Sequence, residues 1–450
     1  MHRIRRQILE LELPHEAGAL ALQRRASRVF QEQVLPRLDE VFSRIAPADR
    51  VVRIERLELD LGDLSEANWE QDFVEKCVAQ ISQQVAEAAF AVGGETPTET
   101  LNAEENALAV LLYFLQTGML PWYAKHLTLK TLEENLQKAI SSRNAFQSKV
   151  LHRILKENPA ALQRLVWQFS IALSEKIVES VLGLSKGWIQ HAIQIRQSQT
   201  GQIMSAKAFI ELAKPLLNAE ISVLRNSTPT PALLAQLFFS ENPAVPKSPI
   251  VNTHSDSELQ IAAPKPAANI KLDTPNTTQP KADPIGVSVD NAGLVLLAVY
   301  LPPFLKKLGI ELSGSSITDH HYHAVHLLHY LATRQEHPEE PMLVLPKILC
   351  GMEIETPVPQ EMDLSDEEKN EANKLLEAVI KNWSILKSTS PDGLRAGFLQ
   401  RTGLLSWEVN RQSWVLRIER LGQDLLLEKV PWSYSVIKLP WMEKMLQVEW

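Results

Sequence analysis

The sequence predicts an α+β protein that is predominantly α-helical. Apolar residues recur at helical spacing through most of the first 225 residues, and two short stretches, residues 9–13 and 57–61, alternate strictly between leucine and an acidic residue. Between residues 226 and 289 the composition becomes proline-rich. At 450 residues the chain is too long for one ordinary core, so we expect several domains.

The first domain, residues 1–95, is predicted as a small β-α-β-α module. Residues 4–13 form the first strand, because the alternation of Leu-Glu-Leu-Glu-Leu is typical of a half-buried strand. A helix follows over 16–45, and Pro36 is expected to kink or split it. The second strand covers 51–61, and the second helix covers 67–92.

The second domain, residues 100–225, is predicted to be helical throughout. No fixed period repeats along it, so a compact helical array is expected rather than a solenoid. The predicted helices lie at 103–117, 128–140, 144–156, 159–182, 186–196 and 205–224.

Residues 226–289 are predicted to form a disordered or extended linker. Ten of the 27 prolines fall here among Ser, Thr, Asn and Lys, and such a segment cannot bury enough apolar surface to offset the entropy of ordering. One short helix is expected within it, at 232–239.

The last domain, residues 290–450, is predicted to be mainly helical and to end in short strands. Ser365 and Glu368 form a capping box, and Asp392 is interpreted as the N-cap of a helix that ends at Gly403. The predicted helices are 292–307, 319–334, 343–350 and 365–387, and the predicted strands are 412–421 and 434–439.

One short sequence motif occurs twice. Residues 53–57 (Arg-Ile-Glu-Arg-Leu), followed by Asp60-Leu61, return as residues 417–421, followed by Asp424-Leu425. Either two amphipathic strands resemble each other by coincidence, or the N- and C-terminal strands belong to one sheet or to two similar modules.

Composition excludes several classes of protein. A net charge of −8 and a pI near 5.9 argue against nucleic-acid binding, which requires a basic face. No signal peptide and no membrane span is expected, because the most apolar stretch, 292–305, is short and contains two prolines. Cys77 and Cys350 lie far apart in unlike contexts, which fits reduced thiols in a cytoplasmic protein.

No catalytic residue, cofactor site or metal site is predicted. Six of the twelve histidines lie between 320 and 337, but neither an HExxH frame nor a nearby cysteine accompanies them. We therefore expect a partly exposed helix whose histidines titrate near neutral pH. Cys350 has no evident base beside it and is interpreted as a core thiol. The sequence contains no glycine-rich phosphate loop.

Five of the ten tryptophans lie between Trp407 and Trp450. Large aromatic side chains mark a core or an interface, so this end of the chain must dock on its own domain or on a partner. The residues predicted to take part in protein interaction are Trp414, Trp432, Trp441, Met442, Trp450, Arg395, Phe398 and Arg401.

Several short motifs occur in a fixed order at the two ends of the chain. They are 2–7 (HRIRRQ), Leu35-Pro36, 53–62 (RIERLELDLG), 292–297 (AGLVLL), 301–304 (LPPF), 308–309 (LG), 324–331 (AVHLLHYL), 347–351 (KILCG), Trp383, 386–387 (LK), Ser390, 393–395 (GLR), 398–401 (FLQR) and 439–442 (LPWM). Through these motifs the first and last parts of the chain resemble the tape measure proteins of extracellular, phage-tail-like contractile injection systems. About 60 residues at the front and 160 at the back carry the resemblance, while residues 100–290 match no family motif; Arg334 stands where a glycine is expected.

The resemblance implies a structural protein without an active site, whose partners are tube, baseplate or other structural subunits of the particle. It also implies a cytoplasmic location during assembly and, afterwards, a place within the particle, whether or not the particle is released. Two mechanisms follow. The chain is either a ruler that sets tube and sheath length from inside the tube, or an assembly adaptor or chaperone whose two folded parts are joined by the 226–289 linker. A metal enzyme that uses the histidine cluster is the third reading. Varying the linker length separates the first two.

Overall fold

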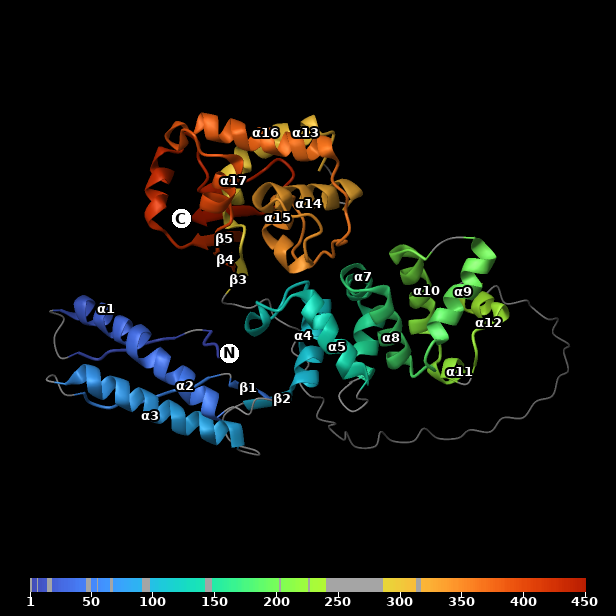
Figure 1. Cartoon of the computed structure of the whole chain (residues 1–450), viewed down its shortest axis with the longest axis horizontal. Coiled ribbons are helices and arrows are strands. Elements are labelled where there is room, and N and C mark those ends of the chain that lie inside the picture. Colours follow the sequence, from blue (N-terminus) through green and yellow to red (C-terminus); the bar gives the residue numbers. More distant parts are fainter. Residues whose placement is uncertain are drawn as a thin grey trace, which may run out of the picture.

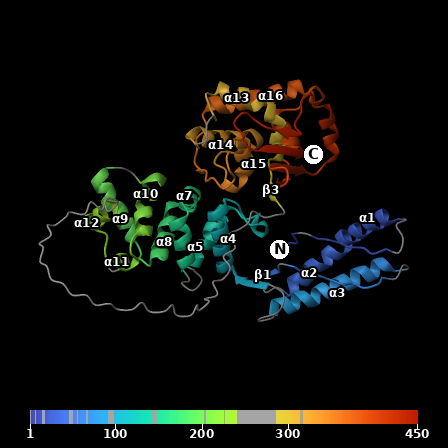
Figure 2. The ribbon, with the colours of Figure 1, turned by 180° about the vertical axis from the view of Figure 1, so that it is seen from behind.

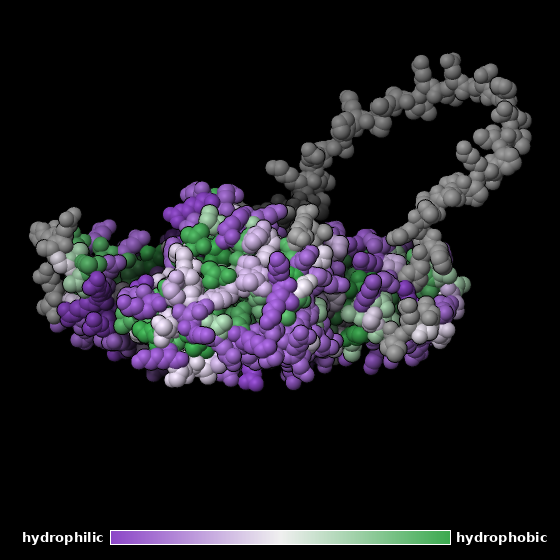
Figure 3. Space-filling view, turned by 90° about the horizontal axis from the view of Figure 1, so that it is seen from above, coloured by the Kyte–Doolittle hydropathy of each residue, from purple (hydrophilic) through white to green (hydrophobic). Residues whose placement is uncertain are grey.

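The computed structural model describes residues 2–5, 7–13, 18–45, 50–54, 56–64, 68–90, 98–141, 148–201, 204–225, 227–239, 286–312 and 317–450. The described chain forms an N-terminal helix pair, a central helical region and a C-terminal domain (Figure 1). This is the mostly helical α+β fold that the sequence predicts. Apolar and polar residues are interspersed over the upper face (Figure 3).

In the N-terminal module, one long helical segment packs beside a second helix, and their facing side chains form a small core (Figures 1 and 2). The first segment stays helical through Pro36, but a π-helical turn just before this residue divides it into two α-helices. In this turn Leu35 N–H donates to Phe30 O, and this geometry accommodates a residue without an N–H. The helical elements are α1 (Ala19–Val29), η1 (Phe30–Val34), α2 (Leu35–Ile45) and α3 (Trp69–Phe90).

The strands of this module differ from the prediction. Only β1 (Arg50–Ile54) forms a ladder, and it pairs antiparallel with β2 (Thr98–Asn102), which lies beyond the predicted module boundary. Residues 7–13 and 56–64 join no ladder within the described residues. The predicted β-α-β-α order was therefore wrong in detail. Alternation of apolar and polar residues indicates that one face is half-buried, but it does not indicate which strand, if any, pairs with the segment.

The central region is the helical array that the sequence predicts, built around one apolar core. The predicted helix 159–182 is two helices, because Phe169 is extended and the hydroxyl of Ser170 caps the second one by accepting from Leu173 N. The elements are α4 (Ala103–Thr117), η2 (Trp122–Ala124), α5 (Leu129–Ser141), α6 (Ser148–Glu157), α7 (Pro159–Gln168), α8 (Ile171–Leu182), α9 (Trp188–Thr200), α10 (Ala206–Asn218), α11 (Ile221–Arg225) and α12 (Pro231–Phe239).

The predicted linker is shorter than residues 226–289. At its start, α12 packs on the helical core through Leu234, as the expected short helix. At its end, Val287–Val289 form β3, which pairs with β4 (Gly403–Glu408). The predicted disorder of residues 240–285 lies outside the described residues.

The C-terminal domain folds helices around a five-stranded sheet in the order β3-β4-β5-β7-β6, in which β5 and β7 are parallel. Strands β4 and β7 were not predicted. Because β1 belongs to a different sheet, the one-sheet explanation of the repeated text is wrong. The remaining elements are η3 (Ala292–Tyr300), α13 (Leu301–Lys307), α14 (Asp319–Thr333), η4 (Glu340–Leu343), α15 (Val344–Leu349), α16 (Asp366–Asn382), η5 (Ser384–Leu386), α17 (Pro391–Leu394), η6 (Arg395–Leu399), β5 (Ser413–Ile418), η7 (Gly422–Lys429), β6 (Val436–Ile437) and β7 (Met445–Glu449).

Two details of this domain bear on the predictions. Ser390, and not Asp392, is the N-cap of α17, because its hydroxyl accepts from Gly393 N; the helical turns end at Leu399. Arg334 caps the C-terminus of α14 with φ +62°, a left-handed conformation that favours glycine. This conformation explains why a glycine is expected at that position.

Candidate functional site

Arg401 and Trp450 from the predicted interaction set meet at Asp424, inside the C-terminal domain. The guanidinium of Arg401 donates to both carboxylate oxygens of Asp424 at 2.6 and 2.9 Å, and Trp450 Nε1 donates to Asp424 Oδ2 at 3.0 Å. Burial alone would raise the pKa of Asp424, but these bonds and one from Leu421 N hold the pKa below its usual value. The cluster fastens Trp450 to η7.

Two more residues of the set, Trp432 and Phe398, pack around Trp383, and a third, Arg395, bonds to α14. The indole of Trp432 donates to Leu296 O at 2.9 Å and lies edge-on to Trp383, and the Phe398 ring lies 4.8 Å from the Trp383 ring. Arg395 is buried and donates to Leu331 O at 3.0 Å. These contacts join η3, α14, the end of α16 and the π-helical turn η6.

The last three residues of the set lie near strand ends. Trp441 Nε1 donates to Leu349 O at 2.8 Å, and the next residue, Met442, is buried. Trp414 on β5 lies edge-on to Trp407 on β4, with ring centres 5.2 Å apart. Of the eight residues, Trp414, Trp432 and Trp441 are half-buried and the others are buried, all in contacts within their own domain. Their contact with a partner stays a prediction.

The histidine cluster was expected to be partly exposed and to titrate near neutral pH, and that expectation was wrong for His321, His326 and His329, which are buried and whose pKa values burial lowers. His326 and His329 are buried on α14, and burial lowers the pKa of each to about 4. His326 Nε2 lies 2.8 Å from Pro359 O, and His323 bonds Glu368. Within the described residues, no three His, Cys, Asp or Glu side chains come close enough to hold a metal ion.

Cys350 is also a core residue. Its thiol is buried at the end of α15, and burial raises its pKa above the usual value. A thiol that stays protonated is a poor nucleophile, so its position fits packing better than chemistry.

The most concentrated group of buried charges lies where the helical region meets the C-terminal domain. Arg164 of α7, Glu340 of η4 and Lys347 of α15 are each 0% exposed. Arg164 Nε donates to Glu340 Oε1 at 3.1 Å, and Lys347 Nζ donates to the same oxygen at 2.7 Å. We call these three residues the junction triad.

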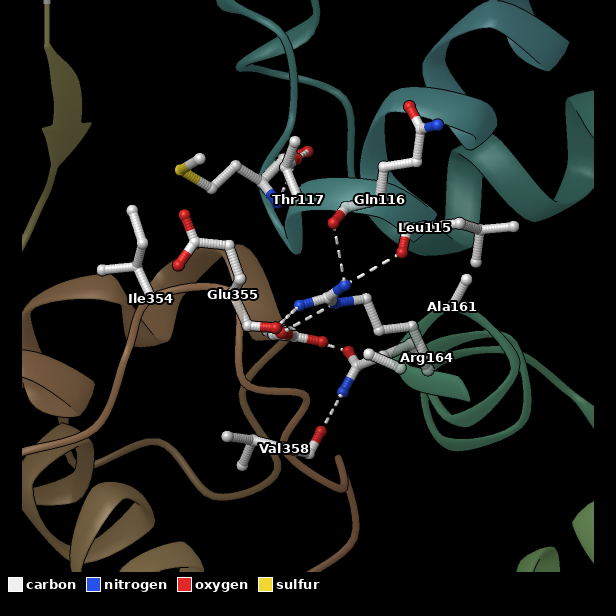
Figure 4. Close-up of polar contacts among 12 residues, drawn as sticks. Leu115, Gln116, Thr117, Ala161, Arg164, Ile354, Glu355 and Val358 are labelled. Atoms are coloured by element: carbon white, nitrogen blue, oxygen red, sulfur yellow. Dashed lines mark hydrogen bonds and ion pairs between the residues drawn. The ribbon is translucent and has the colours of Figure 1, made fainter. Parts of the chain in front are cut away.

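Arg164 reaches both domains at once (Figure 4). Its Nη1 donates to Leu115 O at 2.9 Å and to Gln116 O at 3.3 Å at the end of α4, and its Nη2 donates to Glu355 O. Lys347 Nζ also donates to Ile354 O at 3.1 Å. Its pKa is lowered by burial, against the opposing effect of Glu340. Charges withdrawn from water in this way are held only because partners surround them.

A second layer of contacts extends the junction. Gln168 Nε2 donates to Val358 O at 2.8 Å, and its Oε1 accepts from Glu340 N at 2.9 Å. The carboxylate of Glu339 accepts from Leu129 N at the start of α5, at 3.0 Å. Gly118 ends α4 against the triad, where an added Cβ would lie 2.5 Å from Glu340 Oε1.

Sequence reasoning missed the junction triad. A signal was present, because Arg164 and Lys347 each interrupt an otherwise apolar helix face, at residues 161–166 and 343–350. Glu340, the charged partner of Arg164, lies 176 residues away in the sequence, so no spacing rule connects the two. The junction triad is fully buried and joins the central helical region to the C-terminal domain.

Comparison with known families gives one match. The model of the contractile injection system tape measure protein family matches residues 1–450, and so extends over the middle part in which the sequence motifs are absent. No curated protein and no solved structure matches the chain. Nowhere in the described part is a helix both long and apolar enough to cross a membrane. The chain belongs to the contractile injection system tape measure protein family, which indicates a structural role in the injection system.

Proposed function

We propose that this protein helps to set the tube and sheath length of a contractile injection particle, and that it does so as a docked, folded body and not as an extended ruler. The junction triad is the observation that carries this proposal. It closes the central helical region on the C-terminal domain through buried charges. Opening it would leave these charges without partners, which costs several kcal/mol.

The docked arrangement changes the role of the proline-rich segment. Before residue 240 the chain is held by α12 on the helical core, and after residue 285 it is held by β3 in the C-terminal sheet. The segment therefore connects two bodies that already contact each other. Lengthening such a loop has a small effect, since each doubling costs only about 0.6 kcal/mol.

The test is particle length measured by electron microscopy. Residues 240–285 are halved or doubled while α12 and β3 are kept. We expect unchanged, uniform lengths, whereas deletion of the whole chain abolishes length uniformity or assembly. Lengths that shift in proportion to the inserted residues would overturn the docked-body mechanism in favour of an extended ruler.

The protein acts without catalysis, in the cytoplasm during assembly, on tube and baseplate subunits. Its buried His326, His329 and Cys350 support a non-enzymatic role, because each packs inside the fold. The second candidate is an assembly adaptor. It is favoured by the apolar side chains that the N-terminal module exposes, among them Ile8, which is 61% exposed. An adaptor is required for particle yield and leaves the length of assembled particles unaffected.

A further inference from the structure

A short ladder and three arginines join the N-terminal module to the central helical region. The ladder pairs β1 with β2 (Figure 1). Asn102, the last residue of β2, caps α4, because its side chain accepts from Glu105 N while its own N–H donates to Glu105 Oε2. Strand β2 is therefore fixed to the central region, and β1, whose Ile54 packs on the core of the module, lies on the other side of the joint.

Beside the ladder, three arginines of the module contact the 3₁₀ turn η2 of the central region. We call them the arginine strap: Arg3, Arg5 and Arg53. Arg3 Nη1 donates to Tyr123 O at 2.6 Å, and the guanidinium carbon of Arg53 lies over the Tyr123 ring, 4.0 Å from its centre. A guanidinium over an aromatic face is attracted by the ring quadrupole, more strongly where both groups are partly withdrawn from water. Arg53 and Tyr123 are both half-buried.

The first described residues bridge the two bodies. His2 Nδ1 lies 2.7 Å from Asp39 Oδ1 on α2. The next residue, Arg3, reaches the η2 turn, and Arg5 lies over the ring of Trp122, 6.0 Å from its centre. Neighbouring residues of one short segment thus hold a helix of the module and a turn of the central region together.

The joint at η2 is less closely packed than the junction triad. A cavity of about 3280 Å³ is lined from both sides, by α2 and α3 of the module and by Trp122, Tyr123 and Leu127 of the central region. Trp122 is 38% exposed, whereas each residue of the junction triad is 0% exposed. Contacts that water reaches contribute little, while buried charges are costly to leave without partners. The joint at η2 should therefore open at a lower free energy than the junction.

We propose that the arginine strap makes a releasable joint, at which the N-terminal module undocks as a folded unit while the junction triad keeps the other two parts together. The module can leave without unfolding, because it buries a core of its own that includes Phe30, Leu38 and Phe73. Parts of a protein that move are those whose local opening costs least. The inference goes beyond the proposed function, and its test on the purified protein does not involve particle length, so either can fail alone.

Hydrogen exchange of the purified full chain tests this order of opening. In the unchanged protein, the amides of the β1–β2 ladder are expected to exchange faster than those of α15, which carries Lys347 of the junction triad. The strap variant is Arg3→Gln, Arg5→Gln and Arg53→Gln. It should speed exchange at the ladder by about tenfold or more and leave the amides of α3 and α15 unchanged.

The matched control makes the same change in charge on exposed arginines of α1 and α2 and should leave exchange at the ladder as it is: Arg24→Gln, Arg28→Gln and Arg37→Gln. A double-mutant cycle then isolates the contact of Arg53 with the ring. Arg53→Gln and Tyr123→Leu together should speed exchange at the ladder by less than the product of their separate effects, because each removes the same contact.

Several other results would overturn the proposal. Unchanged exchange at the ladder in the strap variant would mean that the arginines do not hold the joint. Faster exchange of α3 by the same factor would mean that they hold the fold of the module itself, and faster exchange of α15 that the module and the junction open as one unit. An equal response of the control variant would assign the effect to net charge. A strictly additive cycle would mean that the contact between Arg53 and Tyr123 contributes nothing.

Discussion

The C-terminal domain and the N-terminal module contain the same short text and use it differently. In both copies the strand ends at the isoleucine of Arg-Ile-Glu-Arg-Leu, so β1 ends at Ile54 and β5 ends at Ile418. The aspartate that follows is buried and bonded to Arg401 in the C-terminal copy, Asp424, and exposed in the N-terminal copy, Asp60. The same short sequence therefore ends in a buried, ion-paired aspartate in the C-terminal domain and in an exposed aspartate in the N-terminal module.

The difference lies in the neighbours that the chain supplies. Strand β5 lies between β4 and β7, and the η7 turn after it meets Arg401 and Trp450. The N-terminal copy has β2 beside β1, but within the described residues the segment 56–64 pairs with no strand; its carbonyls accept from side chains of α3, and its leucines pack on the helices. An amphipathic strand becomes part of a sheet only where another strand is available to pair with its backbone.

The largest expected effect tests whether the stability of the C-terminal domain depends on its contact with the central helical region. Arg164→Met removes one of the two donors to the buried Glu340 carboxylate, leaving Lys347, and removes the guanidinium that bonds the carbonyls of Leu115 and Gln116. We expect the two parts to unfold in separate urea transitions, with a loss of about 3–5 kcal/mol. Tryptophan fluorescence follows the C-terminal part. Arg196→Met, which removes a half-exposed pair with Glu211, should cost less than about 1 kcal/mol.

The second prediction compares the two aspartates directly. Asp424→Ala leaves the buried Arg401 unpaired and should cost about 3–5 kcal/mol, whereas Asp60→Ala should change stability by less than about 0.5 kcal/mol. Denaturant unfolding of both variants measures the difference. Equal losses would mean that the two copies are equivalent and that the comparison is mistaken.

The third prediction concerns pH. Burial lowers the pKa of His326 and His329 to about 4 in the folded state, below the value of about 6.5 for an unfolded chain. The unfolded state therefore binds protons first, so stability is full above about pH 6.5 and falls as the pH decreases toward 4. His329→Leu should make this decline shallower in thermal unfolding at a series of pH values. His191→Leu, at an exposed histidine of α9, should leave the slope unchanged.

The smallest effect concerns Arg334, at the left-handed end of α14. Arg334→Gly removes backbone strain but also the bond from its guanidinium to Asp392. Arg334→Ala loses the same bond and keeps the strain. We expect the glycine variant to be more stable than the alanine variant by about 1 kcal/mol in urea unfolding. Equal stability would show that the conformation at this position carries no strain.

Particular residues show how far sequence reasoning reaches. The helix over 103–117 was predicted at its observed bounds. In the structure Asn102 and Glu105 cap its start and Gly118 ends it, and all three signals are local. The burial of His326 and the pairing of Arg164 with Glu340 were not predictable. Both depend on residues that are distant in sequence, at Pro359 and on η4.

The sequence alone determined the mostly helical α+β class, most helix positions and the resemblance to the tape measure family, because periodicity, caps and motif order are written within short windows. The tertiary structure decided which alternating segments became strands, that the tryptophan-rich end packs into its own domain, and that the junction triad joins two domains. These outcomes depend on which backbone and side-chain partners the fold brings together, and a local pattern does not encode its distant partner.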